Sequence, residues 1–108
     1  MRRVSALWEI WYECNDRWFG GKLVPPTSIR ITRAKKYDGT LLVTVSENDE
    51  IIRNKIMISA HVKDVLGVML HEMIHQYQVF VLNEDPDHDG AFRCYAKYLE
   101  RQTGATVR

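Results

Sequence analysis

Two histidines spaced four residues apart, His71 and His75, are the side chains in this sequence best suited to bind a metal ion. Four residues advance an α-helix by about 400°, so the two imidazoles would project from one helix face, one turn apart. At that spacing both can bind one Zn²⁺ ion at about 2.0–2.1 Å without bending the helix. Glu72 would lie roughly 60° around the helix from His75, where its carboxylate can reach a water on the metal. The segment therefore predicts a zinc site with Glu72 as general base.

A catalytic zinc site commonly takes a third protein ligand and leaves its fourth position to water. The sequence contains two further histidines, His61 and His88. His61 would lie before or within the first turn of the same helix, more than two turns from His71, so we interpret it as a helix-start or surface residue. His88 follows the helix in an acidic turn that can fold back along it. We therefore predict that His71, His75 and His88 hold one catalytic Zn²⁺ ion.

Two alternative interpretations concern the histidine pair and the acidic turn that contains His88. The histidines can be a satisfied core pair beside an exposed glutamate, but two imidazoles and a carboxylate buried without a shared partner would cost several kcal/mol of desolvation. The acidic turn 85–90 matches the first half of a calcium-binding EF-hand loop, but its twelfth position is Ala96, where the loop needs a bidentate glutamate. We therefore reject calcium and interpret the aspartates as turn formers, solvated charges or hydrogen-bond partners of the metal ligands.

Three helices and about three short strands are expected to position this site. Apolar residues recur at helical spacing on both sides of a region rich in β-branched residues and turns. We predict an α+β fold in which a small, mainly antiparallel sheet packs with the helices, and the central helix carries His71 and His75. Ser59 is expected to cap that helix, and Gly67 within it indicates a close packing contact. The expected elements are helix 4–19, strands 28–32, 40–46 and 55–59, helix 62–82 and helix 91–102.

Composition and charge limit the classes of function. With 108 residues, of which 45% are hydrophobic, the chain is expected to form one domain over residues 1–108. A net charge of +1 gives no overall electrostatic case for nucleic-acid binding. The apolar runs are too short to span a bilayer, and no signal peptide is visible. Cys14 and Cys94 form neither a disulfide framework nor a zinc ribbon, so we expect a reducing, cytoplasmic location, with no zinc-ribbon module or C-terminal tail.

The residues around the histidines resemble those of the SprT-like (Spartan-type) metalloprotease family. The opening helix is similar to the family's Asn-x-x-x-Phe-x-x-Lys-Leu entrance, and the third histidine precedes a phenylalanine by four residues, as in the family's His-Gly-x-x-Phe segment. The resemblance implies a zincin-like minimal metalloprotease domain, a zinc-dependent endopeptidase whose substrates are proteins bound or crosslinked to DNA. The matching residues are Asn15, Phe19, Lys22, Leu23, His71, Glu72, His75, His88, Phe92, Thr103, Gly104 and Ala105.

The sequence contains two local clusters of positive charge that are candidates for a contact with DNA. One is the segment Met1–Arg3, and the other contains Arg30, Arg33, Lys35 and Lys36. These side chains can contact DNA phosphates near a protein substrate. Alternatively, the first cluster is a frayed terminus and the second a solvated loop.

A competing interpretation involves no catalysis. The protein would then be a zinc-stabilised module that binds DNA or protein, and the metal would only organise its fold. A structural metal site has no need of a general base, so the presence of Glu72 favours the enzyme. In the enzyme, one of the short strands is expected to pair with an extended peptide, and the sequence leaves open which strand this is.

Overall fold

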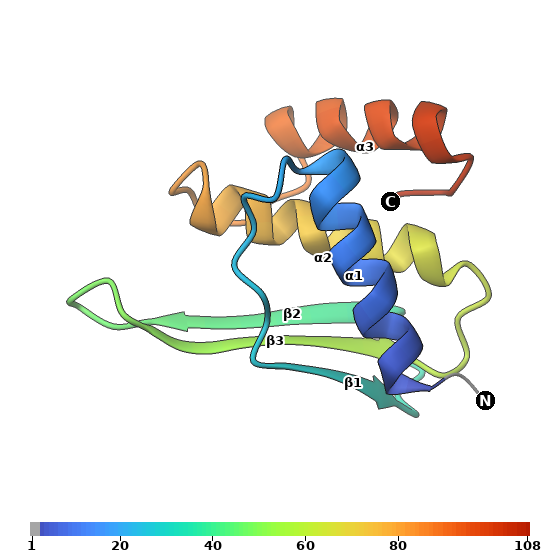
Figure 1. Ribbon diagram of the computed structural model, residues 1–108, viewed down its shortest axis with the longest axis horizontal. Helices are drawn as coiled ribbons and strands as arrows, with labels where there is room; N and C mark the ends of the chain where they lie inside the picture. Colours follow the sequence, from blue (N-terminus) through green and yellow to red (C-terminus); the bar gives the residue numbers. More distant parts are fainter. Residues whose placement is uncertain (1–2) are drawn as a thin grey trace.

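The computed structural model describes residues 3–108 as three helices and one three-stranded sheet (Figure 1). The predicted α+β class and the number of helices and strands are confirmed. The first strand has the predicted bounds, whereas the third begins at Ile51 instead of residue 55. In chain order the elements are α1 Val4–Trp18, β1 Ser28–Thr32, β2 Gly39–Val45, β3 Ile51–Ser59, α2 Val65–Phe80 and α3 Gly90–Thr103.

The sheet is mixed, so the expectation of a mainly antiparallel sheet is wrong. β3 lies between the other two strands, antiparallel to β2 and parallel to β1. A short polar turn joins β2 to β3 as a hairpin, but the chain then enters the sheet between β2 and the earlier β1. Strand periodicity identifies strands without giving their order in space, so it carried no sign of this insertion. The order leaves β1 and β2 as the two edges of the sheet.

The three helices lie on one side of the sheet in Figure 1, with α2 next to the strands and α3 farthest from them. Between these layers lie fully buried side chains from every helix and from the middle strand, among them Trp11, Ile56, Met73 and Leu99. Each such side chain contributes about 1.5–3 kcal/mol through the burial of apolar surface. The indole of Trp11 donates to Gln76 Oε1 at 2.8 Å, so its polar atom is satisfied inside the core. Within residues 3–108, no helix has the length and apolar character needed to cross a membrane.

Asp64, and not Ser59 as expected, caps the N-terminus of α2. Its Oδ1 accepts a hydrogen bond from Gly67 N at 2.9 Å, and its Oδ2 accepts one from Thr106 N at 2.8 Å. Ser59 ends β3, and its hydroxyl donates to Ala34 O at 2.7 Å, so it fastens the connection between β1 and β2 instead. Gly67 has the predicted close contact, because a Cβ there would collide with Thr106 O. The residues after α3 therefore pack on the first turn of α2, immediately before the histidine pair.

Candidate metal centre

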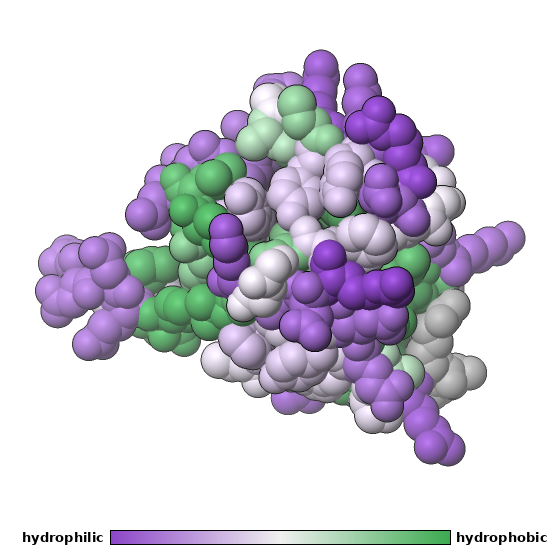
Figure 2. Space-filling view, turned by 45° about the horizontal axis from the view of Figure 1, so that its top comes forward, coloured by the Kyte–Doolittle hydropathy of each residue, from purple (hydrophilic) through white to green (hydrophobic). Residues whose placement is uncertain are grey.

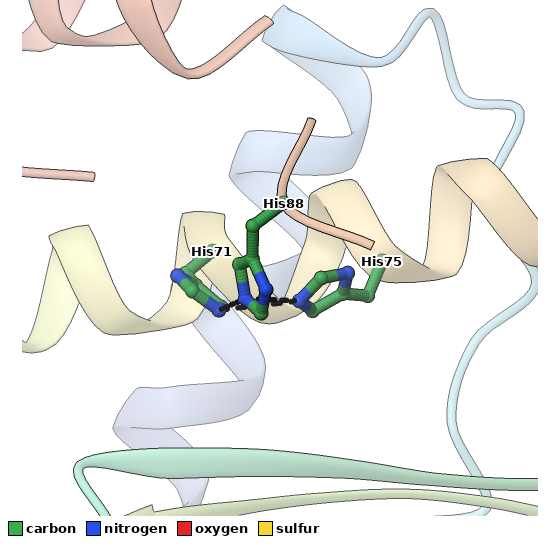
Figure 3. Close-up of side chains that lie close together, drawn as sticks. All are labelled: His71, His75 and His88. Atoms are coloured by element: carbon green, nitrogen blue, oxygen red, sulfur yellow. Dashed lines mark hydrogen bonds between the residues drawn. The ribbon is translucent and has the colours of Figure 1, made fainter. Parts of the chain in front are cut away.

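The structure brings His71, His75 and His88 together at one point (Figure 3). The first two lie one turn apart on α2, and the third lies in the loop between α2 and α3. The Nε2 atoms of His71 and His75 are 3.2 Å apart. His88 Nε2 is 3.2 Å from the Nε2 of His75 and 3.1 Å from that of His71. The three nitrogens thus form a nearly equilateral triangle.

Hydrogen bonding among the three nitrogens does not explain this triangle. A ring nitrogen either carries a hydrogen or offers a lone pair, so among three nitrogens at least two have the same role and cannot bond to each other. A single metal ion removes the conflict, because it accepts all three lone pairs. An ion about 2.05 Å from each nitrogen would see them at angles of about 100°, near the tetrahedral value. The cluster therefore fits a metal ion, and zinc is one of several transition metals that imidazole ligands suit.

Burial favours the neutral form of the two histidines on α2. Burial, together with smaller contributions from the neighbouring His75 and His88, lowers the pKa of His71 to about 4. Burial also lowers the pKa of His75. A metal ion binds the neutral imidazole, so at neutral pH neither side chain has to release a proton before binding.

Glu72 lies beside the cluster without belonging to it. Its Oε2 is 4.0 Å from His71 Nε2, which is too long for a hydrogen bond. Its side chain is 6% exposed, and the hydrogen bonds found within residues 3–108 include none to its carboxylate. Burial raises the pKa of this carboxyl group to about 8. Such a group, free of partners and with a pKa near neutrality, can both accept and release a proton.

Two hollows meet at Glu72, and both are also lined by Gly39 and His71. The larger, of about 720 Å³, extends towards the start of α2. The smaller, of about 490 Å³, follows β2 as far as Val45 and reaches the acidic loop before α3. Because β2 is an edge strand, its unpaired main chain borders the centre. The edge strand next to the candidate site, which the sequence left open, is therefore β2.

Gly39 explains how β2 can approach α2 so closely. A Cβ at this position would lie 2.6 Å from Val68 Cγ1 and 3.2 Å from Glu72 Oε2. Sequence analysis missed this role, because a glycine that follows Asp38 in front of a β-rich run is typical of a turn. Only the packing of the strand on the helix identifies it as part of the site.

Phe92 packs against all three imidazoles from α3. Its ring centroid is 4.9 Å from that of His71, 5.0 Å from that of His75 and 4.9 Å from that of His88. The ring is stacked on His75 and meets the other two more nearly edge to face. The packing of Phe92 restricts the rotation of the three imidazole side chains, and α3 thereby contributes to their arrangement.

The other residues that the sequence singled out near this site have different roles in the structure. His61 is exposed in the turn before α2, as expected, and takes no part in the cluster. Asp87 is a hydrogen-bond partner of the site: its Oδ1 accepts from Gln78 Nε2 and from Asp89 N, each at 3.1 Å. Gln78 is the other residue that sequence analysis missed. Among the residues that the structure describes, the three histidines are the one group of potential ligands close enough to hold a metal ion.

The basic residues lie at the opposite edge of the sheet. Arg30 and Arg33 line a hollow of about 590 Å³ beside β1, and Trp8 of α1 lines the same hollow. Lys35 and Lys36 are exposed in the connection to β2. None of the residues lining this hollow lines either of the two at Glu72. Met1 and Arg2 of the other basic cluster fall outside the described residues.

Comparison with known proteins gives a family for this arrangement. A model of the SprT-like family matches residues 7–108, which is nearly the whole chain. A search of the curated proteins found no match. The matched region contains Glu72, the three histidines and the elements that carry them.

Proposed function

The chain belongs to the SprT-like family, and from this premise we propose that it is a zinc-dependent endopeptidase with a zincin-like active site. One observation carries the proposal: a buried carboxyl group without a hydrogen-bond partner among residues 3–108 lies 4.0 Å from a nitrogen of the three-histidine cluster. Metal binding alone would need the histidines, but it gives no reason to bury Glu72 beside them at the cost of desolvation.

His71, His75 and His88 would hold the zinc ion, as the fit of their nitrogens supports. When bound, zinc lowers the pKa of a water towards about 7 and polarises the scissile carbonyl group. Glu72 takes a proton from the attacking water and passes it to the leaving amine. In the metal-free protein burial raises the pKa of Glu72 to about 8, and a zinc ion held beside it would favour the ionised carboxylate, which is the form that accepts the proton.

The edge of β2 would bind the substrate. An extended peptide can add to an exposed strand through main-chain hydrogen bonds, which place few demands on its sequence. A peptide along β2 would pass Gly39 at the point where the strand meets Glu72, and its side chains could enter the hollows on either side. Cleavage within a chain, rather than at its end, follows because both hollows continue beyond the cluster.

The competing function, a non-catalytic module stabilised by zinc, receives less support. Structural zinc sites are usually closed by four protein ligands. Within residues 3–108, three candidate ligands meet here, and two hollows open at the same place.

Metal removal tests the proposal directly. The chelated protein is expected to lose cleavage of an unfolded polypeptide, and one equivalent of Zn²⁺ is expected to restore it. Mass spectrometry of the products should show internal cuts. Restored folding with zinc, but no cleavage of DNA-bound or free polypeptides, would instead support the structural module.

We extend the proposal to substrates that are bound or crosslinked to DNA, in an intracellular, cytoplasmic setting. The SprT-like resemblance supports the substrate class, and the two free cysteines, Cys14 and Cys94, suit a reducing compartment. The hollow beside β1 supports a DNA contact, because it combines Arg30 and Arg33 with an aromatic side chain, Trp8. Arginines can bind phosphates, and an aromatic ring can stack on an unpaired base.

Replacing Arg30 and Arg33 together with serine is expected to weaken binding of single-stranded DNA. Two lost phosphate contacts should reduce the slope of log affinity against log salt by roughly 1–2. Fluorescence anisotropy with a labelled oligonucleotide at several salt concentrations measures this slope. The double replacement of Lys97 and Arg101, exposed on α3, is the matched control. An equal change in both variants would show that only net charge matters.

A further inference from the structure

Gln78 is a fully buried polar residue that connects α2 to the loop carrying His88. Its Oε1 is 2.9 Å from His75 Nδ1, and the main-chain nitrogen of Asp87 donates to the same oxygen at 3.3 Å. Its Nε2 donates to Asp87 Oδ1 at 3.1 Å. The Gln78 carboxamide thus contacts one candidate metal ligand, His75, directly. Through Asp87 it also holds the loop that carries a second candidate ligand, His88.

The orientation of this carboxamide is determined by its partners. The main-chain N–H of Asp87 can only donate, and the Asp87 carboxylate can accept, so the oxygen and nitrogen of Gln78 cannot be exchanged. Because Oε1 only accepts, His75 Nδ1 must carry the hydrogen of their shared bond. A neutral imidazole carries one hydrogen, so His75 Nε2 is left with its lone pair directed at the cluster.

The same contacts fasten the loop on both sides of His88. Asp87 is bonded to Gln78 through its main chain and its side chain, and Asp87 Oδ1 also accepts from Asp89 N at 3.1 Å. The main chain of Gln78 takes part as well, since its carbonyl oxygen accepts from Glu84 N at 3.0 Å. His88 itself is exposed, so apart from its contact with Phe92 its position depends on these hydrogen bonds of the loop.

We propose that Gln78 is a positioning residue of the metal centre, which selects the metal-binding tautomer of His75 and holds the loop of His88 against α2. The proposal rests on the metal site of the proposed function but not on peptide cleavage. It predicts that zinc affinity depends on a side chain that does not itself bind the ion. Loss of a hydrogen-bond partner of a metal-ligating histidine typically weakens metal binding roughly 10–100-fold.

Gln76 provides a matched control on the same helix. It is also a fully buried glutamine, but its carboxamide accepts from Trp11 Nε1 and donates to Asn54 Oδ1 and Val24 O. These contacts lie on the side of α2 that faces α1 and the sheet. Replacing Gln76 therefore removes a buried amide of the same type without touching the histidines.

The test compares Gln78→Leu with Gln76→Leu in two measurements. Competition with a chromophoric chelator gives the zinc affinity, which Gln78→Leu is expected to lower roughly 10–100-fold and Gln76→Leu to leave unchanged. Nitrogen chemical shifts of the His75 ring in the metal-free protein give its tautomer. The wild type and Gln76→Leu are expected to show hydrogen on Nδ1, whereas Gln78→Leu should show a mixture.

An exposed pair of variants keeps the test decisive if a buried replacement prevents folding. Asp87→Ala removes the acceptor of Gln78 Nε2 and should weaken zinc binding while leaving the His75 tautomer intact, because the main-chain N–H remains. Asp85→Ala, in the same exposed loop, should change neither. Zinc affinity unchanged by both Gln78→Leu and Asp87→Ala, or an unaltered His75 tautomer in Gln78→Leu, overturns the proposal. The tautomer is measured without metal or substrate, so a protein that fails to cleave peptides can still bear this inference out.

Discussion

Replacing Glu72 with glutamine is expected to lower the rate of peptide cleavage roughly 10²–10⁴-fold, the usual contribution of a general acid–base group. Glutamine has nearly the same shape, so it should fit the same buried space beside His71. It cannot take a proton from water, and the route from water to leaving amine is therefore broken. Zinc content should stay at about one ion per chain, because Glu72 is not among the three clustered ligands.

The comparison of zinc content with cleavage rate decides between loss of chemistry and loss of structure. Zinc is measured by elemental analysis and cleavage by the appearance of new peptide termini. Full cleavage by Glu72→Gln would exclude the proposed mechanism. Loss of zinc together with cleavage would instead show that Glu72 helps to bind the ion.

The same substitution has a second consequence in the metal-free protein. Burial raises the pKa of Glu72 from 4.5 to about 8, so between these values the folded chain keeps a proton that the unfolded chain releases. The free energy of unfolding must therefore fall as the pH rises through this window. His71 acts in the opposite sense, but only between its lowered pKa of about 4 and its ordinary value of 6.5. Chemical denaturation between pH 6.5 and 8 should thus show a decline in the wild type that Glu72→Gln lacks.

The parts of this site that the sequence predicted are those set by local geometry. His71 and His75 lie on one helix, so their spacing alone places both imidazoles on one face. His88 comes soon after that helix, and a loop of this length can bring it back only to nearby positions. The periodicity of apolar residues likewise located the helices, because each buries one face in the common core.

The parts that escaped prediction depend on contacts between distant segments. The insertion of β3 between β1 and β2 decides which edge is free, and no single strand carries that information. Gly39 matters because α2 packs on it. Asp64 rather than Ser59 caps α2 because the helix begins at Val65, while Ser59 is held in β3. Gln78 looks like any polar residue of a helix until the loop folds onto it. Each of these roles arises only when the chain is closed into its tertiary structure.

Replacing His88 with alanine is expected to weaken zinc binding by more than the roughly 10–100-fold typical of a lost outer hydrogen-bond partner. The two histidines on α2 would remain, but two nitrogens hold an ion less tightly than three, and the open position would fill with water. His88 is exposed in its loop, so its removal should change the free energy of unfolding of the metal-free protein by less than about 0.5 kcal/mol.

The effect on stability therefore becomes visible only when zinc is present. Zinc stabilises the folded chain according to its concentration relative to Kd, so affinity weakened 100-fold removes about 2.7 kcal/mol of that stabilisation at a fixed excess of the ion. Thermal unfolding with and without zinc measures the difference. His61→Ala is the matched control, because His61 is also an exposed histidine and lies outside the cluster. If His88→Ala kept the full zinc-dependent rise in Tm, the third ligand would have to be another residue, and the loop between α2 and α3 would lose its place in the metal centre.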